Sequence, residues 1–87
     1  MSGKYYVHVP KTPRKSLHKI PIQWQVRILD VLTELETNPY LGEKMQGKYS
    51  GQRKLKVWPY RILYRIKEKE KFIEVMEIEH RGHTSYD

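Results

Sequence analysis

Two short segments near the middle of the chain carry basic side chains at even spacing. Lys54 and Lys56 lie two residues apart, and Arg61 and Arg65 lie four apart. Both segments have the β-branched and aromatic composition of strands, in which alternate side chains point to the same face. The other face of residues 60–66 is wholly apolar or aromatic, so it should meet the core and leave both arginines on the open face. If the two lysines share that face, four cations line one sheet surface that attracts polyanions.

A second group of candidate residues follows the last apolar segment, in the sequence His80-Arg81-Gly82-His83 and at Tyr86. Cleavage of a phosphodiester needs a group that accepts a proton from the attacking oxygen, another that protonates the departing oxygen, and cations for the charge on the phosphate. Lysine, arginine, tyrosine and histidine can fill these roles without a metal. His80 and His83 are secondary candidates, because a partly buried histidine at a strand end is the simpler interpretation of His80. Two histidines without a cysteine or a carboxylate cluster make a weak metal site, so we expect no metal and no cofactor.

The charge of the chain is strongly basic and unevenly distributed. There are 17 Lys and Arg against 10 Asp and Glu among 87 residues, which gives a net charge of +7. Residues 44–67 include eight basic side chains and no acidic one. Nucleic acid is the commonest partner of such a stretch, with an acidic protein or a merely solvated surface as alternatives. Each basic residue taken singly is more simply a solvated charge, so the prediction depends on the cluster. Further RNA- or ribosome-binding candidates in this stretch are Lys44, Lys48, Arg53, Trp58 and Arg65.

Aromatic and acidic residues outside these groups have simpler expected roles. Trp58 lies at a turn within the basic stretch and is the best candidate for stacking on a base. Tyr40 is a further candidate, whereas Trp24 is more simply a helix-packing residue. Glu74, Glu77 and Glu79 are expected to be solvent-facing charge.

Several classes of protein are excluded by composition and length. The chain has no cysteine, which rules out disulfide frameworks, thiolate metal sites and cysteine nucleophiles. No P-loop, Rossmann glycine fingerprint, paired catalytic acids or serine-triad signature is present. We expect one domain over residues 1–87, located in the cytoplasm, because no apolar run approaches the roughly 18 residues of a membrane span.

The pattern of apolar residues predicts an α+β fold in the order β-α-α-β-β-β. Pro13 follows a potential N-cap threonine, Thr12, and so begins a short first helix. Within residues 22–37 one apolar face is formed by side chains spaced three or four apart, which are Ile22, Val26, Leu29, Leu32 and Leu35 or Glu36. Residues 38–51 form an irregular loop, and the short links between the last three strands make those strands antiparallel. We therefore expect an antiparallel sheet with the two helices packed on one face. The predicted strands are residues 4–9, 53–57, 60–66 and 71–78, and the predicted helices are residues 13–19 and 22–37.

The chain resembles the RelE/ParE superfamily of toxins from bacterial and archaeal toxin–antitoxin pairs. The resemblance is carried by the order of elements, by Lys54-Leu55-Lys56-Val57, by the run Pro59-Tyr60-Arg61-Ile62-Leu63-Tyr64-Arg65-Ile66, and by Ile78-Glu79-His80-Arg81 with Tyr86 nearby. It implies a microbial-ribonuclease-like fold and an acidic antitoxin partner. For the RelE branch it implies cleavage of mRNA in the A site of the ribosome, so that mRNA and the small ribosomal subunit become partners.

The resemblance also implies a role for each matching residue. Lys54 or Tyr86 would be the general base for attack of a ribose 2′-hydroxyl on the adjacent phosphate, leaving a 2′,3′-cyclic phosphate. Arg81 would protonate or stabilise the leaving group, and Arg61 with Lys56 would clamp the phosphate. A lysine or tyrosine base requires neighbouring cations that lower its pKa, and the basic stretch supplies them.

Three functions therefore remain open from the sequence. The first is a ribosome-dependent mRNA endonuclease, favoured by the two strand lysines together with Tyr86. The second is a ParE-like inhibitor that acts on DNA gyrase without cutting RNA, since the His-Arg ending occurs in that branch too. The third is a basic domain, or a decayed toxin, that only binds RNA or antitoxin. The oligomeric state and the codon preference are left open.

Overall fold

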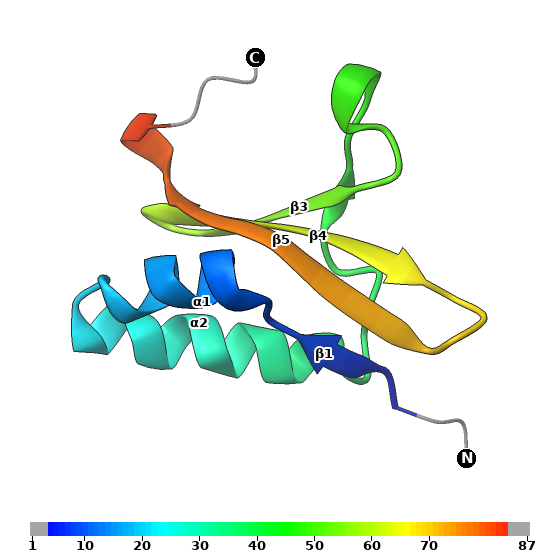
Figure 1. The fold of residues 1–87 in the computed structure, drawn as a ribbon, viewed down its shortest axis with the longest axis horizontal. Helices are drawn as coiled ribbons and strands as arrows, with labels where there is room; N and C mark the ends of the chain where they lie inside the picture. Colours follow the sequence, from blue (N-terminus) through cyan, green and yellow to red (C-terminus); the bar gives the residue numbers. More distant parts are fainter. Residues whose placement is uncertain (1–3, 84–87) are drawn as a thin grey trace.

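The computed structural model describes residues 4–83, in which two helices lie against one side of a sheet (Figure 1). The predicted α+β class, with the helical pair on one face, is confirmed. Strands 53–57 and 60–66 were placed almost to the residue, because their alternation of apolar and charged side chains is regular. The elements are β1 (Tyr6–His8), α1 (Lys11–His18), α2 (Ile22–Leu35), β2 (Glu43–Lys44), β3 (Arg53–Val57), β4 (Tyr60–Lys67) and β5 (Phe72–His80), with 3-10 turns at Gly47–Tyr49 and Arg81–His83.

The sheet is mixed, which differs from the antiparallel sheet expected. Its strand order in the described part of the chain is β1-β5-β4-β3-β2. Strands β2 to β5 pair antiparallel, whereas β1 runs parallel to β5. The argument from short links applies only to consecutive strands, and every other element of the fold lies between β1 and β5. The two-residue strand β2 lies inside the segment that was expected to be an irregular loop.

Helix α1 begins earlier than predicted, and helix α2 begins at Ile22 as predicted but buries only part of its expected apolar face. Helix α1 begins at Lys11 with Pro10 as its N-cap, so Pro13 lies in the first turn, where a missing N–H costs nothing. Helix α2 ends at Leu35, and it buries Ile28, Leu32 and Leu35. The apolar side chains at its start instead lie on the solvent side, with Ile22, Val26 and Leu29 between 48 and 68% exposed. Helix α2 is apolar on more than one side, so spacing alone could not choose the buried face.

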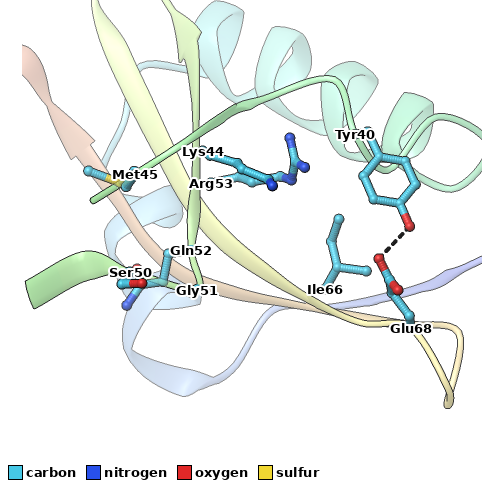
Figure 2. A pocket seen from close by; sticks show the side chains of 9 residues that line it. All are labelled: Tyr40, Lys44, Met45, Ser50, Gly51, Gln52, Arg53, Ile66 and Glu68. Carbon is cyan, nitrogen blue, oxygen red and sulfur yellow. Dashed lines mark hydrogen bonds between the residues drawn. The ribbon is translucent and has the colours of Figure 1, made fainter. Parts of the chain in front are cut away.

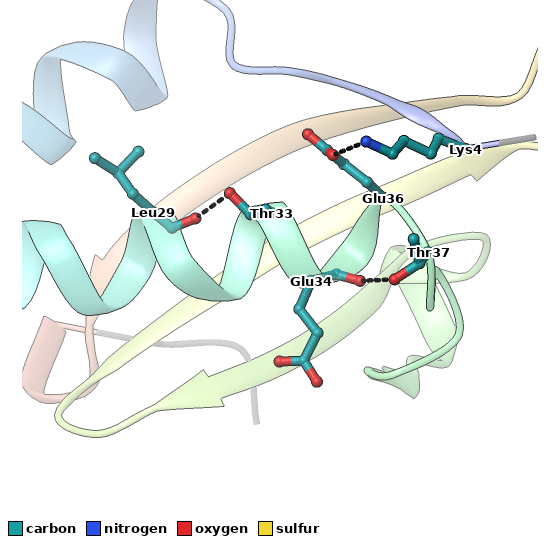
Figure 3. A network of polar contacts seen from close by, with 6 residues as sticks. All are labelled: Lys4, Leu29, Thr33, Glu34, Glu36 and Thr37. Atoms are coloured by element: carbon teal, nitrogen blue, oxygen red, sulfur yellow. Dashed lines mark hydrogen bonds and ion pairs between the residues drawn. The ribbon is translucent and has the colours of Figure 1, made fainter.

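The end of α2 is tied to the first strand through polar contacts (Figure 3). The Thr37 hydroxyl donates to the carbonyl of Glu34 at 3.4 Å, and the Lys4 ammonium lies 3.7 Å from the Glu36 carboxylate. The backbone N–H of Tyr5 also donates to the carbonyl of Glu36 at 2.8 Å. These contacts hold β1 at the edge of the sheet beside β5. Within the described residues, no helix is long and apolar enough to cross a membrane.

A buried tyrosine joins the core to the loop after α2. Tyr64 is fully buried on the helix side of β4, and its hydroxyl donates to the carbonyl of Pro39 at 2.8 Å. The same hydroxyl accepts the N–H of Gly42 at 2.8 Å. A Cβ atom on Gly42 would lie 2.8 Å from the carbonyl oxygen of Lys54, so the close approach of this loop to β3 requires glycine. The loop that precedes β2 is therefore fixed at its base.

Candidate active site

The face of the sheet opposite the helices carries the lysines and arginines that the sequence analysis singled out. In the β3–β4 ladder, Lys54 pairs with Leu63 and Lys56 pairs with Arg61. Directly opposed residues of an antiparallel pair project to the same face, so these four side chains share one surface. The neighbouring positions on β4, including Ile62 and Tyr64, belong to the core. The alternation seen in the sequence therefore separates the two faces as expected.

Three cations converge on a pocket at one end of this open face. Lys56 comes from β3, Arg61 from β4 and Arg81 from the turn after β5, and they line a pocket of about 140 Å³ together with Trp58 and Tyr60. The N–H of Arg81 donates to the carbonyl of Pro59 at 2.9 Å, which brings the end of β5 to the β3–β4 turn. The Arg81 guanidinium carbon lies 4.4 Å from the centroid of the Trp58 ring, a cation–π contact. We refer to this cavity as the cationic pocket.

The other residues of the predicted catalytic set lie at different distances from the cationic pocket. Lys54 lies two residues before Lys56 on β3 and does not line the pocket. Tyr86 lies outside the described residues. His80 is exposed, its Nδ1 accepts the N–H of Gly82 at 3.0 Å, and its ring packs edge-on against Tyr60 at 5.3 Å. His83 lies in the 3-10 turn that follows β5.

The remaining basic candidates are distributed over both faces of the sheet. Lys44 and Arg53 are cross-strand partners on the helix side, because Arg53 also pairs with Tyr64. They line a separate pocket of about 300 Å³ that includes Tyr40 and Glu68 (Figure 2). Alternation along β3 already predicts that Arg53 lies on the face opposite Lys54 and Lys56, and its pairing with Tyr64 confirms this; only Lys44 was counted in the same basic surface. The last two candidates are Lys48, whose ammonium lies 5.5 Å from the Tyr49 ring centroid, and Arg65, which is at the far end of the open face.

Two aromatic candidates for base stacking are already engaged by other side chains. The Tyr40 hydroxyl donates to the Glu68 carboxylate at 2.6 Å, and the Arg53 guanidinium lies 5.0 Å over its ring. The hydrogen bond to Glu68 raises the pKa of Tyr40. Trp24 packs beside Tyr60 at 6.4 Å between ring centroids, as expected of a helix-packing residue. Trp58, at 62% exposed, is the most open of these aromatic side chains.

Acidic side chains of β5 share the open face with the cations, which the sequence analysis did not foresee. Glu79 pairs with Arg61 and Glu77 pairs with Leu63. The register shifts between Leu63 and Tyr64, where Met76 is an extra residue on β5. Strict alternation from the buried Ile73 and Val75 would have turned both glutamates toward the helices, and the bulge reverses this. These carboxylates therefore lie on the solvent side of the sheet, as expected, but beside the cations of β4.

The acidic residues of β5 interact with one another and with the cations. Partial burial raises the pKa of Glu77, and a hydrogen bond and charge repulsion from Glu79 raise it further. Glu74 forms ion pairs with Arg65 at 3.4 Å and with Lys67 at 4.0 Å. The open face thus combines cations on β3 and β4 with carboxylates on β5.

The arrangement offers chemistry based on cations and proton-transfer groups. Among the described residues, no group of three or more His, Cys, Asp or Glu side chains is placed to hold a metal ion. The cationic pocket presents two guanidinium groups and one ammonium group, which together can bind a phosphate through charged hydrogen bonds. The adjacent carboxylates of β5 add groups that can accept a proton.

Comparisons with known structures agree with the fold. The toxin–antitoxin complex RelBE2 from Mycobacterium tuberculosis is 25% identical over 90% of this chain and 99% of the matched chain, with a TM-score of 0.84. The archaeal RelE–RelB complex from Pyrococcus horikoshii OT3 is 23% identical over 93% of this chain and 99% of the matched chain, with a TM-score of 0.77. A mutant E. coli toxin RelE in the free state also has a TM-score of 0.77, at 14% identity over 93% of this chain and 87% of the matched chain.

The family comparison covers most of the sequence. No match was found among curated proteins. The sequence model of the family described as "ParE toxin of type II toxin-antitoxin system, parDE" matches residues 12–84, a range that contains α1 except its first residue, all of α2, β2 to β5 and the cationic pocket. The chain therefore belongs to the ParE toxin family, and with it to the RelE/ParE superfamily of type II toxins.

Proposed function

We propose that this toxin is a ribosome-dependent endoribonuclease that cuts mRNA in the A site. The observation that carries the proposal is the convergence of Lys56, Arg61 and Arg81 on one pocket of the open face. Three fixed cations suit a scissile phosphate, because charge builds on its oxygens as the attacking group approaches. The exposed ring of Trp58 at the rim can stack on a neighbouring base.

The proposed reaction is an internal transesterification. The ribose 2′-oxygen forms a bond to phosphorus as its proton passes to the base, and the bond from phosphorus to the 5′-oxygen breaks. The products are a 2′,3′-cyclic phosphate and a free 5′-hydroxyl. Lys54 or Tyr86 accepts the first proton, Arg81 protonates or stabilises the departing oxygen, and Arg61 with Lys56 holds the phosphate.

The test is to add the purified protein to a translating cell-free extract and map new mRNA 5′ ends by primer extension. We expect cuts inside codons that require translating ribosomes. Arg61→Ala and Arg81→Ala should abolish them while the proteins still fold. Arg14→Ala removes an exposed arginine of α1 instead and serves as the matched control. Normal cleavage by both pocket variants would show that the assigned roles are wrong.

A second candidate function is supported by the family itself. The matching family is that of ParE toxins, so inhibition of DNA gyrase without RNA cleavage is the alternative. It predicts growth arrest with DNA damage and intact mRNA. Intact mRNA in the extract, together with inhibited supercoiling by purified gyrase, would replace the first proposal with this one.

We further propose that an acidic antitoxin binds this chain. The similar structures from M. tuberculosis and P. horikoshii are toxin–antitoxin complexes, and the net charge of +7 favours an acidic partner. Ribosome or RNA binding by the free toxin should weaken steeply with salt, as contacts to phosphate require. A flat salt response would contradict the use of the basic surface.

A further inference from the structure

Three stacked rings occupy the corner of the open face farthest from the cationic pocket. Tyr6 and Phe72 are partners in the β1–β5 ladder, with ring centroids 5.7 Å apart and planes inclined by 27°. The His8 ring stacks against Phe72 at 6.0 Å and 29°. Phe72 precedes the fully buried Ile73, so the three rings project away from the helices. Tyr6 is 64% exposed, and the stack therefore presents a ring surface to solvent.

A line of cations on β4 connects the two ends of the open face. Arg61, Arg65 and Lys67 occupy the same side of β4, because they are separated by even numbers of residues. The strand spans about 20 Å from Arg61 to Lys67 at roughly 3.4 Å per residue. Lys67 pairs with Phe72, and its ammonium lies 5.8 Å from the centroid of that ring. The line begins at the cationic pocket and ends at the aromatic stack.

One acidic residue competes for these cations. The Glu74 carboxylate lies 3.4 Å from Arg65 and 4.0 Å from Lys67. The Arg65 and Lys67 side chains remain 45 and 46% exposed, so each retains donors for a second, solvent-side acceptor. Exposed ion pairs of this kind contribute little energy, and a phosphate can replace the carboxylate.

We propose that Tyr6, His8 and Phe72 form a base-stacking site for single-stranded RNA, reached along the cations of β4 from the cationic pocket. The site deepens the proposed function, on which it rests for the choice of RNA. Aromatic rings flanked by Lys and Arg on an open sheet face bind unpaired bases by stacking while the cations follow the backbone. A strand bound in the cationic pocket therefore contacts the protein a second time, several nucleotides away.

The test measures RNA binding by fluorescence anisotropy at low salt, with oligoribonucleotides that are 2′-O-methylated so that they cannot be cut. A trinucleotide can occupy only the cationic pocket, whereas a strand of about ten nucleotides also reaches the stack. Tyr6→Leu should weaken binding of the long strand at least about fivefold, the effect of losing roughly 1 kcal/mol of stacking, and leave the trinucleotide unchanged. Tyr6→Trp should restore the long-strand affinity. Ile22→Ala is the control, since it removes an apolar side chain that is 68% exposed on α2, on the other side of the sheet.

Two further arms test the chemistry of the site. Glu74→Gln should tighten binding of the long strand by freeing Arg65 and Lys67. Replacing the distal nucleotides with abasic residues should reproduce the loss seen in Tyr6→Leu. The proposal would be overturned if Tyr6→Leu weakened binding of the trinucleotide and of the long strand equally. It would also be overturned if Tyr6→Leu changed the affinity for neither RNA, which is the result expected if a protein covers this corner. Cleavage in the extract is a separate measurement, so a protein that cuts mRNA but shows no length dependence would refute only this site.

Discussion

Replacing Tyr64 with phenylalanine removes one buried hydroxyl where the core meets the loop after α2, and it leaves two buried backbone groups without this partner. The hydroxyl donates to the carbonyl of Pro39 and accepts the N–H of Gly42, both at 2.8 Å, and Tyr64 is fully buried. An unsatisfied buried polar group costs about 1–3 kcal/mol. Because the carbonyl keeps a second lone pair, we expect a total loss of about 2 kcal/mol from the free energy of unfolding. At about 4–8 °C per kcal/mol for a chain of this size, Tm should fall by about 8–16 °C.

The assay is thermal and urea unfolding of Tyr64→Phe beside Tyr40→Phe. Tyr40 also loses a hydrogen bond, to Glu68, but at the surface, so its Tm should change much less. A similar Tm for both variants would refute the argument that the loop is fixed through Tyr64. Burial raises the pKa of Tyr64 in the folded protein. The unfolded chain then releases this proton first as pH rises, so stability should decline above about pH 10, and Tyr64→Phe should reduce that decline.

Three further outcomes are expected. Trp58→Leu removes the ring against which Arg81 stacks, and it should slow single-turnover mRNA cleavage about two- to fivefold, with Trp58→Phe intermediate; an unchanged rate would show that the contact does not position Arg81. Glu77→Gln should raise Tm at neutral pH, because the pKa of Glu77 is raised in the folded protein and its ionisation therefore opposes folding; the gain should vanish as pH falls below the ordinary value of 4.5, and a gain that persists there would have another cause. Gly42→Ala places a Cβ 2.8 Å from the Lys54 carbonyl oxygen and should cost about 1–3 kcal/mol in urea unfolding, whereas a neutral result would mean that the loop can move away from β3.

The sequence predicted best those elements in which the pattern of apolar and charged residues allows only one choice of bounds and of buried face. Strands β3 and β4 alternate regularly, and the proline at position 59 separates them, so their bounds and faces followed directly. Helix α2 was located correctly, but only Leu32 and Leu35 of its expected apolar face are buried, because apolar residues occur on more than one side. The core selects Ile28 and Leu32 through contacts with distant strands, and no local pattern encodes that choice. The parallel placement of β1 depends on the same long-range packing.

The residues of the candidate site were also predicted from the sequence only in part. Alternation within β3 and β4 was enough to place Lys56 beside Arg61, and the resemblance to known toxins added Arg81. Alternation also places Arg53 on the face opposite Lys56, whereas the position of Lys44 depends on the pairing of β2 with β3, which charge counting along the chain cannot supply. The basic stretch was treated as one surface, and the strands divide it between two faces.

The bulge at Met76 explains why the open face is not uniformly cationic. It keeps Ile78 in the core and turns Glu77 and Glu79 toward Leu63 and Arg61. A sheet bearing only cations would attract a polyanion to any part of its surface, because the field of such a surface is unspecific. Glu77 and Glu79 repel phosphate from the part of β5 beside Leu63 and Arg61, so the cations of β3 and β4 form the favourable path for a polyanion there. Because a bulge next to a functional surface re-aims side chains, under the proposed function this extra residue would determine where on the sheet an RNA backbone can lie.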